Sequence, residues 1–269
     1  MSATGIVIYC LFAGLVVMTG LWAISIAIED SSIVDIWWGA GFVLLGWTAL
    51  LLATWGEGMP WPGGVVTLVL AMVSIWGLRL TIHLARRNLG HGEDPRYVAM
   101  RRKAGASWPL RSLFQVFWLQ GAIMWIVGLP VLVTVASASL GGSTGIPSLA
   151  WLGVAVWAVG MFFETLGDLQ LTRFKADPAN KGVVMDRGLW RYTRHPNYFG
   201  DACVWWGLWV VAASAGHWWT FIGPALINFM LVRVSGKTLL EKGMKETRPG
   251  YAEYIRRTSG FIPRPPLRD

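Results

Sequence analysis

Charge is scarce in this chain, and no Lys or Arg occurs among its first 78 residues. Only 14% of its 269 residues are charged and 54% are hydrophobic, whereas charged residues make up roughly 25% of a soluble domain. No Lys or Arg precedes Arg79. The composition therefore excludes an ordinary soluble domain and indicates an integral membrane protein.

Cysteine and histidine are also rare, and several binding motifs are missing. The two cysteines, Cys10 and Cys203, lie in apolar runs, which favours burial over a disulfide or a nucleophile. With four scattered histidines they make no ligand spacing, so no metal is expected. No GxGxxG or P-loop motif occurs, which excludes a Rossmann or Walker nucleotide site. No aromatic and basic module accompanies the charge, so nucleic acid is not an expected partner.

What the sequence does contain is a series of apolar runs near the length of a membrane-spanning helix, about 20 residues. The sixth is short, and the first lacks the basic start of a signal peptide. The sequence predicts an all-α integral membrane bundle of seven transmembrane helices. The runs are Gly5–Ile28, Ile33–Trp55, Gly64–Leu84, Pro109–Ala136, Leu149–Leu166, Phe199–Ala213 and Trp219–Val234.

The distribution of basic residues predicts the orientation of this bundle. All 23 Lys and Arg residues fall at or beside the loops after the third, fifth and seventh runs. By the positive-inside rule those loops are cytoplasmic, with the N-terminus outside and the C-terminus inside. The net charge of +8 is then one-sided. It is explained either by topology and anionic lipid or by a basic pocket for a nucleotide diphosphate.

The sequence shows no internal repeat, and we expect a single membrane domain over residues 1–269. Residues 1–58 supply two helices almost without polar groups, and residues 79–269 carry nearly all the ionisable chemistry. Asp35 is an exception, because it lies just inside the second run beside Trp37 and Trp38. Two interpretations stay open for Asp35: a helix-start charge capped by a nearby serine, or a group that orients or protonates a substrate.

The segment "RLTIHLARRNLGHGEDPRYVAMRRK" leads from the third run into a polar stretch. Arg79, His83 and Arg86 share one helical face, which is either a basic collar or the edge of a site. The stretch that follows crowds ionisable groups into what we interpret as a site loop: Glu93, Asp94, Arg96 and Tyr97.

Two further segments carry polar groups on helix faces. Glu164 and Asp168 are four residues apart at the end of the fifth run, and two acids on one face require cations or hydroxyl donors opposite them. In "RYTRHPNYFGDACVWWG", Pro196 suits the first turn of a helix. Asn197 and Asp201 would then share a face behind three basic side chains, a pattern that suits a phosphate and a sugar.

The tail contains Glu241, which could face that segment, and then "YAEYIRRTSGFIP". The tail is either a surface amphipathic helix or a segment that folds back over the site.

Together, "GLWRYTRHPNYFGDACVWWG", the acid after the next helix and "GYAEYIRRTSGFIP" resemble the C-terminal half of the steroid 5-alpha-reductase family. "RRNLGHGEDPRY" and "DLQLTRFKADPANKG" are similar to its bacterial branch, and the likeness runs from Arg79 to the end. It implies a multi-pass protein of the bacterial inner membrane that reduces, with NADPH, a C=C bond conjugated to a ketone in a hydrophobic substrate. That substrate is a 4-ene-3-ketosteroid or a similar lipid. The cofactor-binding residues that it implies are Arg87, Asn88, Glu164, Asp168, Arg173, Lys175, Arg191, Tyr192, Arg194, His195, Asn197, Tyr198, Asp201, Glu241 and Tyr254.

One departure from that family concerns the ketone. Animal members hold it with a Gln-Glu pair on the second helix and a Tyr on the third, whereas this chain offers Asp35 between apolar residues. We therefore expect the catalytic residues to be Asp35, Tyr97 and Glu93, with Trp37 and Trp38 lining the substrate pocket.

Two other functions remain open. The RHPxYxG core is also similar to that of isoprenylcysteine carboxyl methyltransferases, which would imply S-adenosylmethionine, and sterol C14-reductases share it too. The methyltransferases usually carry paired glutamates after the last helix, whereas Glu241 is followed by Lys242. A non-enzymatic lipid-binding protein would not need such crowding of acids and bases on one side.

Overall fold

The computed structural model describes residues 1–54, 63–138, 145–234, 241, 243–244 and 247–267. Every regular element in these residues is a helix, which confirms the predicted all-helical class. The chain forms two compact units, which we describe separately. The first comprises Met1–Ala150 with Leu208–Gly223, and the second comprises Trp151–Gly207 with Pro224–Asp269. The expectation of a single membrane domain stays a prediction.

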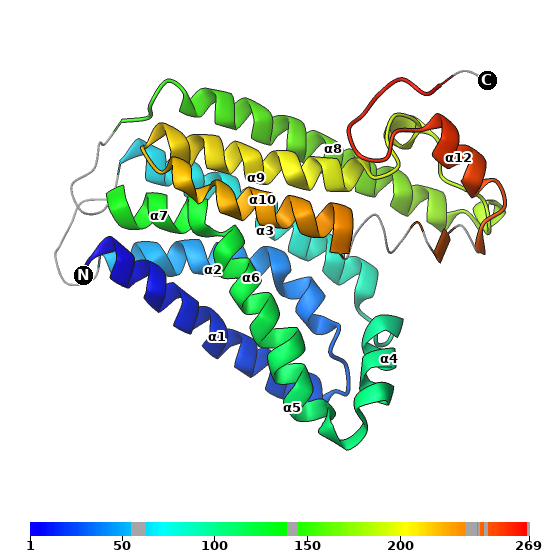
Figure 1. The fold of residues 1–269 in the computed structure, drawn as a ribbon, viewed down its shortest axis with the longest axis horizontal. Helices are drawn as coiled ribbons and strands as arrows, with labels where there is room; N and C mark the ends of the chain where they lie inside the picture. The colour runs from blue at the N-terminus through cyan, green and yellow to red at the C-terminus, as the bar shows by residue number, and fades with distance from the viewer. Residues whose placement is uncertain (55–62, 139–144, 235–240, 242, 245–246, 268–269) are drawn as a thin grey trace. The chain divides into compact units, whose positions relative to one another are not determined.

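The first unit is built on close packing between its second and third helices. A Cβ atom at Gly39 would lie 2.1 Å from the carbonyl oxygen of Gly77, so the two backbones touch where side chains are absent. Figure 1 shows the helices of its first segment, Met1–Ala150, in blue to green. They are α1 (Ala3–Ala27), α2 (Ile33–Thr54), α3 (Gly64–Asn88), α4 (Pro95–Ala104), α5 (Trp108–Ser112), α6 (Leu119–Val127) and α7 (Leu129–Ala138), with a π-helical turn η2 (Leu113–Trp118) between α5 and α6.

The secondary structure of the polar stretch after α3 differs from the one that the sequence predicts. We read residues 93–97 as a loop, but α4 begins at Pro95, so Arg96 and Tyr97 lie on its first turn. The side chain of Asp94 accepts a hydrogen bond from the backbone N–H of Arg96, which is the role of an N-cap, and Pro95 occupies the favourable first helical position. The reading as a loop was wrong because it overlooked this Asp-Pro start signal.

The second unit contains α8 (Ala150–Ala176, from Trp151 on), the first part of α9 (Pro196–Ser214), most of α10 (Ile222–Phe229) with a π-helical turn η6 (Met230–Val234), and α12 (Tyr251–Arg257). α9 begins at Pro196 as predicted. α8 continues past the apolar run that ends at Leu166, through Gly167 to Ala176, and a separate 3-10 turn begins at Pro178. It therefore carries Glu164 and Asp168 on one continuous helix.

Glycines bring α8 and α9 into close contact. Gly153, Gly160 and Gly167 recur every seven residues on α8, and Gly200 and Gly207 do so on α9. A Cβ atom at Gly200 would lie 2.6 Å from the carbonyl oxygen of Gly160, and one at Gly207 would lie 2.7 Å from that of Gly153. Small residues at such positions let membrane helices approach closely, and we call this contact the glycine seam.

Five helical stretches in the described part of the chain are long and apolar enough to cross a membrane: α1, α2, α3, Pro95–Val127 and α8. Large apolar side chains on them are exposed, among them Phe12 and Val16 on α1, as expected for contact with lipid. The predicted sixth span corresponds to α9, with 19 residues, and the seventh to the shorter apolar stretch Trp218–Val234. The protein is therefore multi-pass, while seven spans and the orientation of the termini stay predictions.

Candidate functional site

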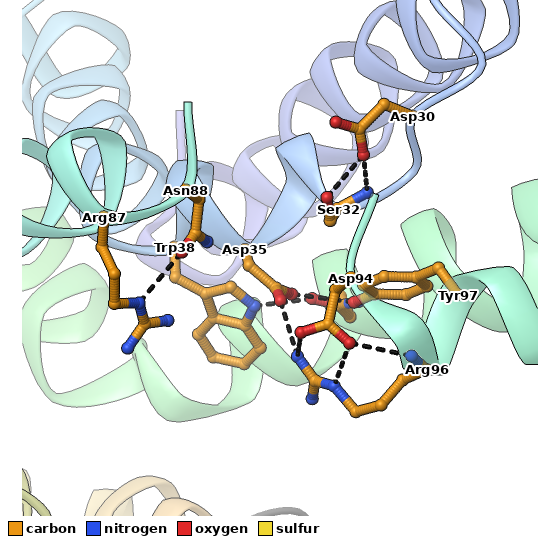
Figure 2. Close-up of polar contacts among 10 residues, drawn as sticks. Asp30, Ser32, Asp35, Trp38, Arg87, Asn88, Asp94, Arg96 and Tyr97 are labelled. Atoms are coloured by element: carbon orange, nitrogen blue, oxygen red, sulfur yellow. Dashed lines mark hydrogen bonds and ion pairs between the residues drawn. The ribbon is translucent and has the colours of Figure 1, made fainter. Parts of the chain in front are cut away.

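In the first unit, polar side chains from three helices meet at Asp35. The Tyr97 hydroxyl donates to Asp35 Oδ1 at 2.8 Å, and Arg96 Nη2 donates to Asp35 Oδ2 at 2.9 Å. The Gln120 amide donates to the Tyr97 hydroxyl at 3.2 Å, and the Trp38 indole donates to Gln120 Oε1 at 2.6 Å. We call these five residues the Asp35 cluster. Figure 2 shows the Tyr97 hydroxyl and the Arg96 guanidinium on the Asp35 carboxylate, with Trp38 close by.

The Asp35 cluster runs from solvent to a buried hydroxyl. The side chain of Arg96 is 48% exposed and that of Asp35 is 19% exposed, whereas Tyr97 is buried at 6%. Arg96 also pairs with Asp94 at 2.9 Å. Partial burial raises the pKa of Asp94, but hydrogen bonds from Arg96 and its charge outweigh this and lower it overall. The outer end is thus an ionised Asp–Arg pair.

Glu93 connects two segments of this unit through its carboxylate. Its Oε1 accepts the backbone N–H of Ser31 at 2.7 Å and pairs with Arg101 at 2.8 Å, and its side chain is only 9% exposed. These bonds tie the loop before α4 to the turn before α2. The structure therefore gives Glu93 a positioning role, and a direct catalytic role for it stays a prediction.

The other predicted residues of this unit lie on α2 and α3. The Trp37 indole lies near Gly41, where an added Cβ atom would be 3.1 Å from its Nε1. At the end of α3, Arg87 Nε donates to Asn88 Oδ1 at 2.9 Å, as Figure 2 also shows. Asp35, Trp38 and Tyr97 are thus brought together, whereas Arg87 and Asn88 pair with each other.

In the second unit, Arg194 is the centre of a buried cluster. Its guanidinium pairs with Glu241 at 2.9 Å, and His195 Nε2 lies 3.1 Å from the same carboxylate oxygen. The His195 ring stacks on Tyr198 with centroids 5.2 Å apart and planes 3° apart. Burial raises the pKa of Glu241, but His195 and Arg194 outweigh it and lower the pKa to about 2. We call these four residues the Arg194 cluster, and they confirm that Glu241 faces this segment.

The tail folds back over the segment before α9, which confirms one of the two interpretations of the sequence. Arg194 donates through Nη1 to the carbonyls of Ile255 and Thr258, and its backbone N–H donates to the carbonyl of Ser259. The Tyr254 hydroxyl donates to the carbonyl of Trp190. Tyr254 is therefore a structural anchor of the tail, with its hydroxyl used inside the protein.

The seam side of α8 faces the start of α9. Asn197 Nδ2 donates to Asp168 Oδ1 at 3.2 Å, and both Glu164 and Asp168 are buried, at 3% and 7% exposure. Asp201 lies one turn further along α9 and is half-buried. Asp168, one of the two acids predicted on α8, thus meets a polar group of α9.

The remaining predicted cofactor residues are exposed. Arg173 and Lys175 lie on the last turns of α8, and Arg191 and Tyr192 precede α9. Among the predicted Arg and Lys residues of this unit, Arg194 is buried and hydrogen-bonded. The other three are exposed: Arg173, Lys175 and Arg191. In the described part of the chain, no three His, Cys, Asp or Glu side chains gather as a metal site would require.

Sequence reasoning missed Gln120 of the Asp35 cluster and the buried Tyr251 of the second unit. Gln120 is one of two amides in the apolar stretch "LFQVFWLQGAIMW", and a polar side chain at membrane depth is itself a signal of function. Tyr251, at the start of α12, is 2% exposed. Its hydroxyl has no hydrogen-bond partner within the described residues, and burial, followed by the charge of Glu241, raises its pKa to about 12.

Residues 21–258 match a family described as a protein of unknown function, DUF1295, which is related to steroid 5-alpha-reductase-like membrane proteins. The chain is 24% identical to an uncharacterized protein of Schizosaccharomyces pombe in an alignment of 272 residues, which covers 91% of this chain and 76% of that protein. It is 32% identical to a probable O-methyltransferase of Ustilaginoidea virens over 113 residues, or 37% of this chain and 39% of that protein. No solved structure matches the chain.

Proposed function

This chain belongs to the family of proteins of unknown function DUF1295, and we propose that it is a membrane reductase. It would use NADPH to reduce a C=C bond conjugated to a ketone in a hydrophobic substrate such as a 4-ene-3-ketosteroid, in the inner membrane of a bacterium. The observation that carries the proposal is the buried hydroxyl of Tyr97, held between the Asp35 carboxylate and the Gln120 amide. Reduction of an enone requires an acid at the ketone, and Tyr97 is a suitable one.

In this proposal Tyr97 polarises the ketone, and Asp35 positions Tyr97. Asp35 already accepts bonds from Tyr97 and Arg96, so as an ionised acceptor it offers no proton to a ketone. The Arg96 charge balances Asp35, which limits repulsion between the carboxylate and the negative charge that develops on the ketone oxygen. Trp37 and Trp38 supply flat apolar surface for a lipid-like substrate.

The second unit fits an anionic dinucleotide. Arg173, Lys175 and Arg191 are exposed cations for phosphate groups, and the buried Tyr251 hydroxyl is a donor without a partner in the described residues. Asp168 and Asn197 offer acceptors and donors for a ribose. When bound, NADPH supplies the hydride. Arg194 and Glu241 satisfy each other, and their part is to hold the tail in place.

A second candidate is an S-adenosylmethionine-dependent methyltransferase, which the similarity to a probable O-methyltransferase favours. Methyl transfer to an oxygen that is already anionic needs no acid. The Asp35 cluster would then have no chemical task, and this is why we prefer the reductase.

The test is to purify the protein in detergent, identify any retained nucleotide by mass spectrometry, and titrate it with NADPH and with S-adenosylmethionine by calorimetry. We expect NADPH to bind and to be consumed with a 4-ene-3-ketosteroid. Tyr97→Phe should lower kcat about 10²- to 10³-fold, the usual effect of removing one donor to a developing oxyanion, with unchanged affinity for NADPH.

Tyr9→Phe is the matched control, because Tyr9 is a 57% exposed tyrosine on α1. It should behave like the parent. Binding of S-adenosylmethionine without NADPH would replace the reductase with the methyltransferase, and enone reduction at the parent rate in Tyr97→Phe would remove Tyr97 from the chemistry.

A further inference from the structure

The Asp35 cluster contains a chain of hydrogen bonds across three helices, and both ends of this chain lie on α2. Trp38 lies three residues after Asp35 on α2, so both side chains leave the same face of the helix. From Trp38 the bonds pass to Gln120 on α6, then to Tyr97 on α4, and return to Asp35. One helix therefore holds both ends of the chain of bonds.

The two ends of this chain have fixed hydrogen-bonding roles. An indole N–H is only a donor, and an ionised carboxylate is only an acceptor. Trp38 therefore requires the oxygen of the Gln120 amide to face it, at 2.6 Å. The amide nitrogen must then point to Tyr97 and donate to its oxygen, which leaves the single Tyr97 proton directed at Asp35. This direction follows from the chemistry of Trp38 and Asp35, whichever way the amide is drawn.

An irregular backbone places Gln120 in this chain. The π-helical turn η2 (Leu113–Trp118) ends two residues before Gln120. One wide turn shifts every later side chain around the helix axis, and such turns recur at functional sites. Trp118, the last residue of this turn, donates to Thr19 on α1 at 3.0 Å and anchors the shifted register.

We propose that Gln120, oriented by Trp38, is the positioning residue that sets the direction of the Tyr97 hydroxyl. The inference rests on the proposed function in one respect, because Tyr97 is the acid there. Tyr97 has one proton, which turns from Asp35 to the ketone oxygen when the substrate approaches, while the Trp38–Gln120 and Gln120–Tyr97 bonds stay in place.

Gln120→Glu tests this with almost no change in size. A carboxylate at this position still accepts from Trp38 but can no longer donate, so the Tyr97 proton is drawn away from Asp35. With a 4-ene-3-ketosteroid, kcat should fall about ten- to a hundredfold, the effect of one lost charge-assisted hydrogen bond, while KM changes little. Trp38→Phe removes only the indole N–H that orients the Gln120 amide, and kcat should fall about three- to tenfold.

The control is Trp47→Phe. Trp47 also lies on α2 and also donates its indole N–H, to Ser74 at 3.0 Å, outside the Asp35 cluster. Its replacement should leave kcat and KM as in the parent, so the comparison separates the loss of this particular bond from the loss of any tryptophan on the helix.

A readout without substrate or cofactor separates this inference from the proposed function. With 3-fluorotyrosine in place of Tyr97, the ¹⁹F NMR signal reports the hydroxyl's hydrogen bonding. It should move in Gln120→Glu and in Trp38→Phe and stay in place in Trp47→Phe. An unmoved signal in both cluster variants overturns the inference. A shifted signal in a protein that reduces no enone supports the inference and removes the proposed function instead.

Discussion

The glycine seam between α8 and α9 predicts a large effect from one added methyl group. A Cβ atom at Gly200 would lie 2.5 Å from the backbone nitrogen of Glu164 and 2.6 Å from the carbonyl oxygen of Gly160. Both are backbone atoms of α8, which cannot rotate away as a flexible side chain can. Gly200→Ala must therefore push the two helices apart.

The size of the effect follows from these distances. Ordinary contact begins at 3.4 Å, so the helices must separate by about 0.9 Å at this point. A gap of that size forfeits roughly a quarter to a half of the dispersion energy of the atoms along it, and overpacking typically costs about 1 to 3 kcal/mol. At roughly 2 to 4 °C per kcal/mol for a chain of this size, the unfolding midpoint should fall by about 2 to 12 °C.

The assay is thermal unfolding in detergent, followed by tryptophan fluorescence. Gly20→Ala is the control, because nothing lies within 4 Å of a Cβ atom at that exposed position on α1. It should be neutral or slightly stabilising, since alanine favours a helix over glycine by about 1 kcal/mol.

Gly160→Ala should resemble Gly200→Ala, and the double variant should lose less than the sum, because one separation relieves both clashes. A Gly200→Ala protein that unfolds at the parent temperature would refute the close approach of α8 and α9. The loss of NADPH affinity that we expect in this variant, through the Asn197–Asp168 hydrogen bond, would go with it.

Two further predictions concern the Arg194 cluster and the topology. The pKa of Glu241 is about 2, below its ordinary 4.5, so its stabilisation is complete above about pH 4.5 and is lost as the pH falls toward 2. The thermal unfolding midpoint of the parent should thus drop more steeply than that of Glu241→Gln between about pH 5 and pH 3. Parallel profiles would contradict a stabilising pair between Glu241 and Arg194. Ser148→Cys and Ala179→Cys should react with an impermeant maleimide from opposite sides, Ala179→Cys from the cytoplasm, and labelling from one side would overturn the predicted orientation.

The sequence predicted those features of the fold and the site that depend on composition or on the chemistry of a single residue. Composition predicted a helical membrane protein, Pro196 predicted the start of α9, and Glu241 was expected to face the segment that contains Arg194, as it does. Asp35 was singled out by the cost of a carboxylate just inside an apolar helix, and Tyr97 by the crowding of ionisable groups in residues 93–97. Their direct bond could not be predicted, because 61 residues, which include the rest of α2 and all of α3, lie between them in the chain.

Other features were visible in the sequence but required the structure to be understood. The seven-residue recurrence of glycine on α8 and α9 indicates two faces made for close packing, yet it does not say which helices pair. Gln120 depends on the π-helical turn before it, and regular helical periodicity places a side chain after such a turn on the wrong face. The irregular backbone is therefore the reason that this residue escaped sequence reasoning.

The hydrogen bonds of the Arg194 guanidinium determine whether this residue can also bind a cofactor phosphate. It makes four hydrogen bonds, two to Glu241 and two to backbone carbonyls, out of five that the group can donate. A buried arginine whose donors are used in this way has little left for a phosphate, and breaking its pair with Glu241 would leave a buried charge uncompensated. Arg173 and Arg191 are exposed instead. In the proposed reductase we therefore expect these outer arginines, and not Arg194, to select NADPH over NADH through its additional phosphate, while Arg194 holds the tail over the start of α9.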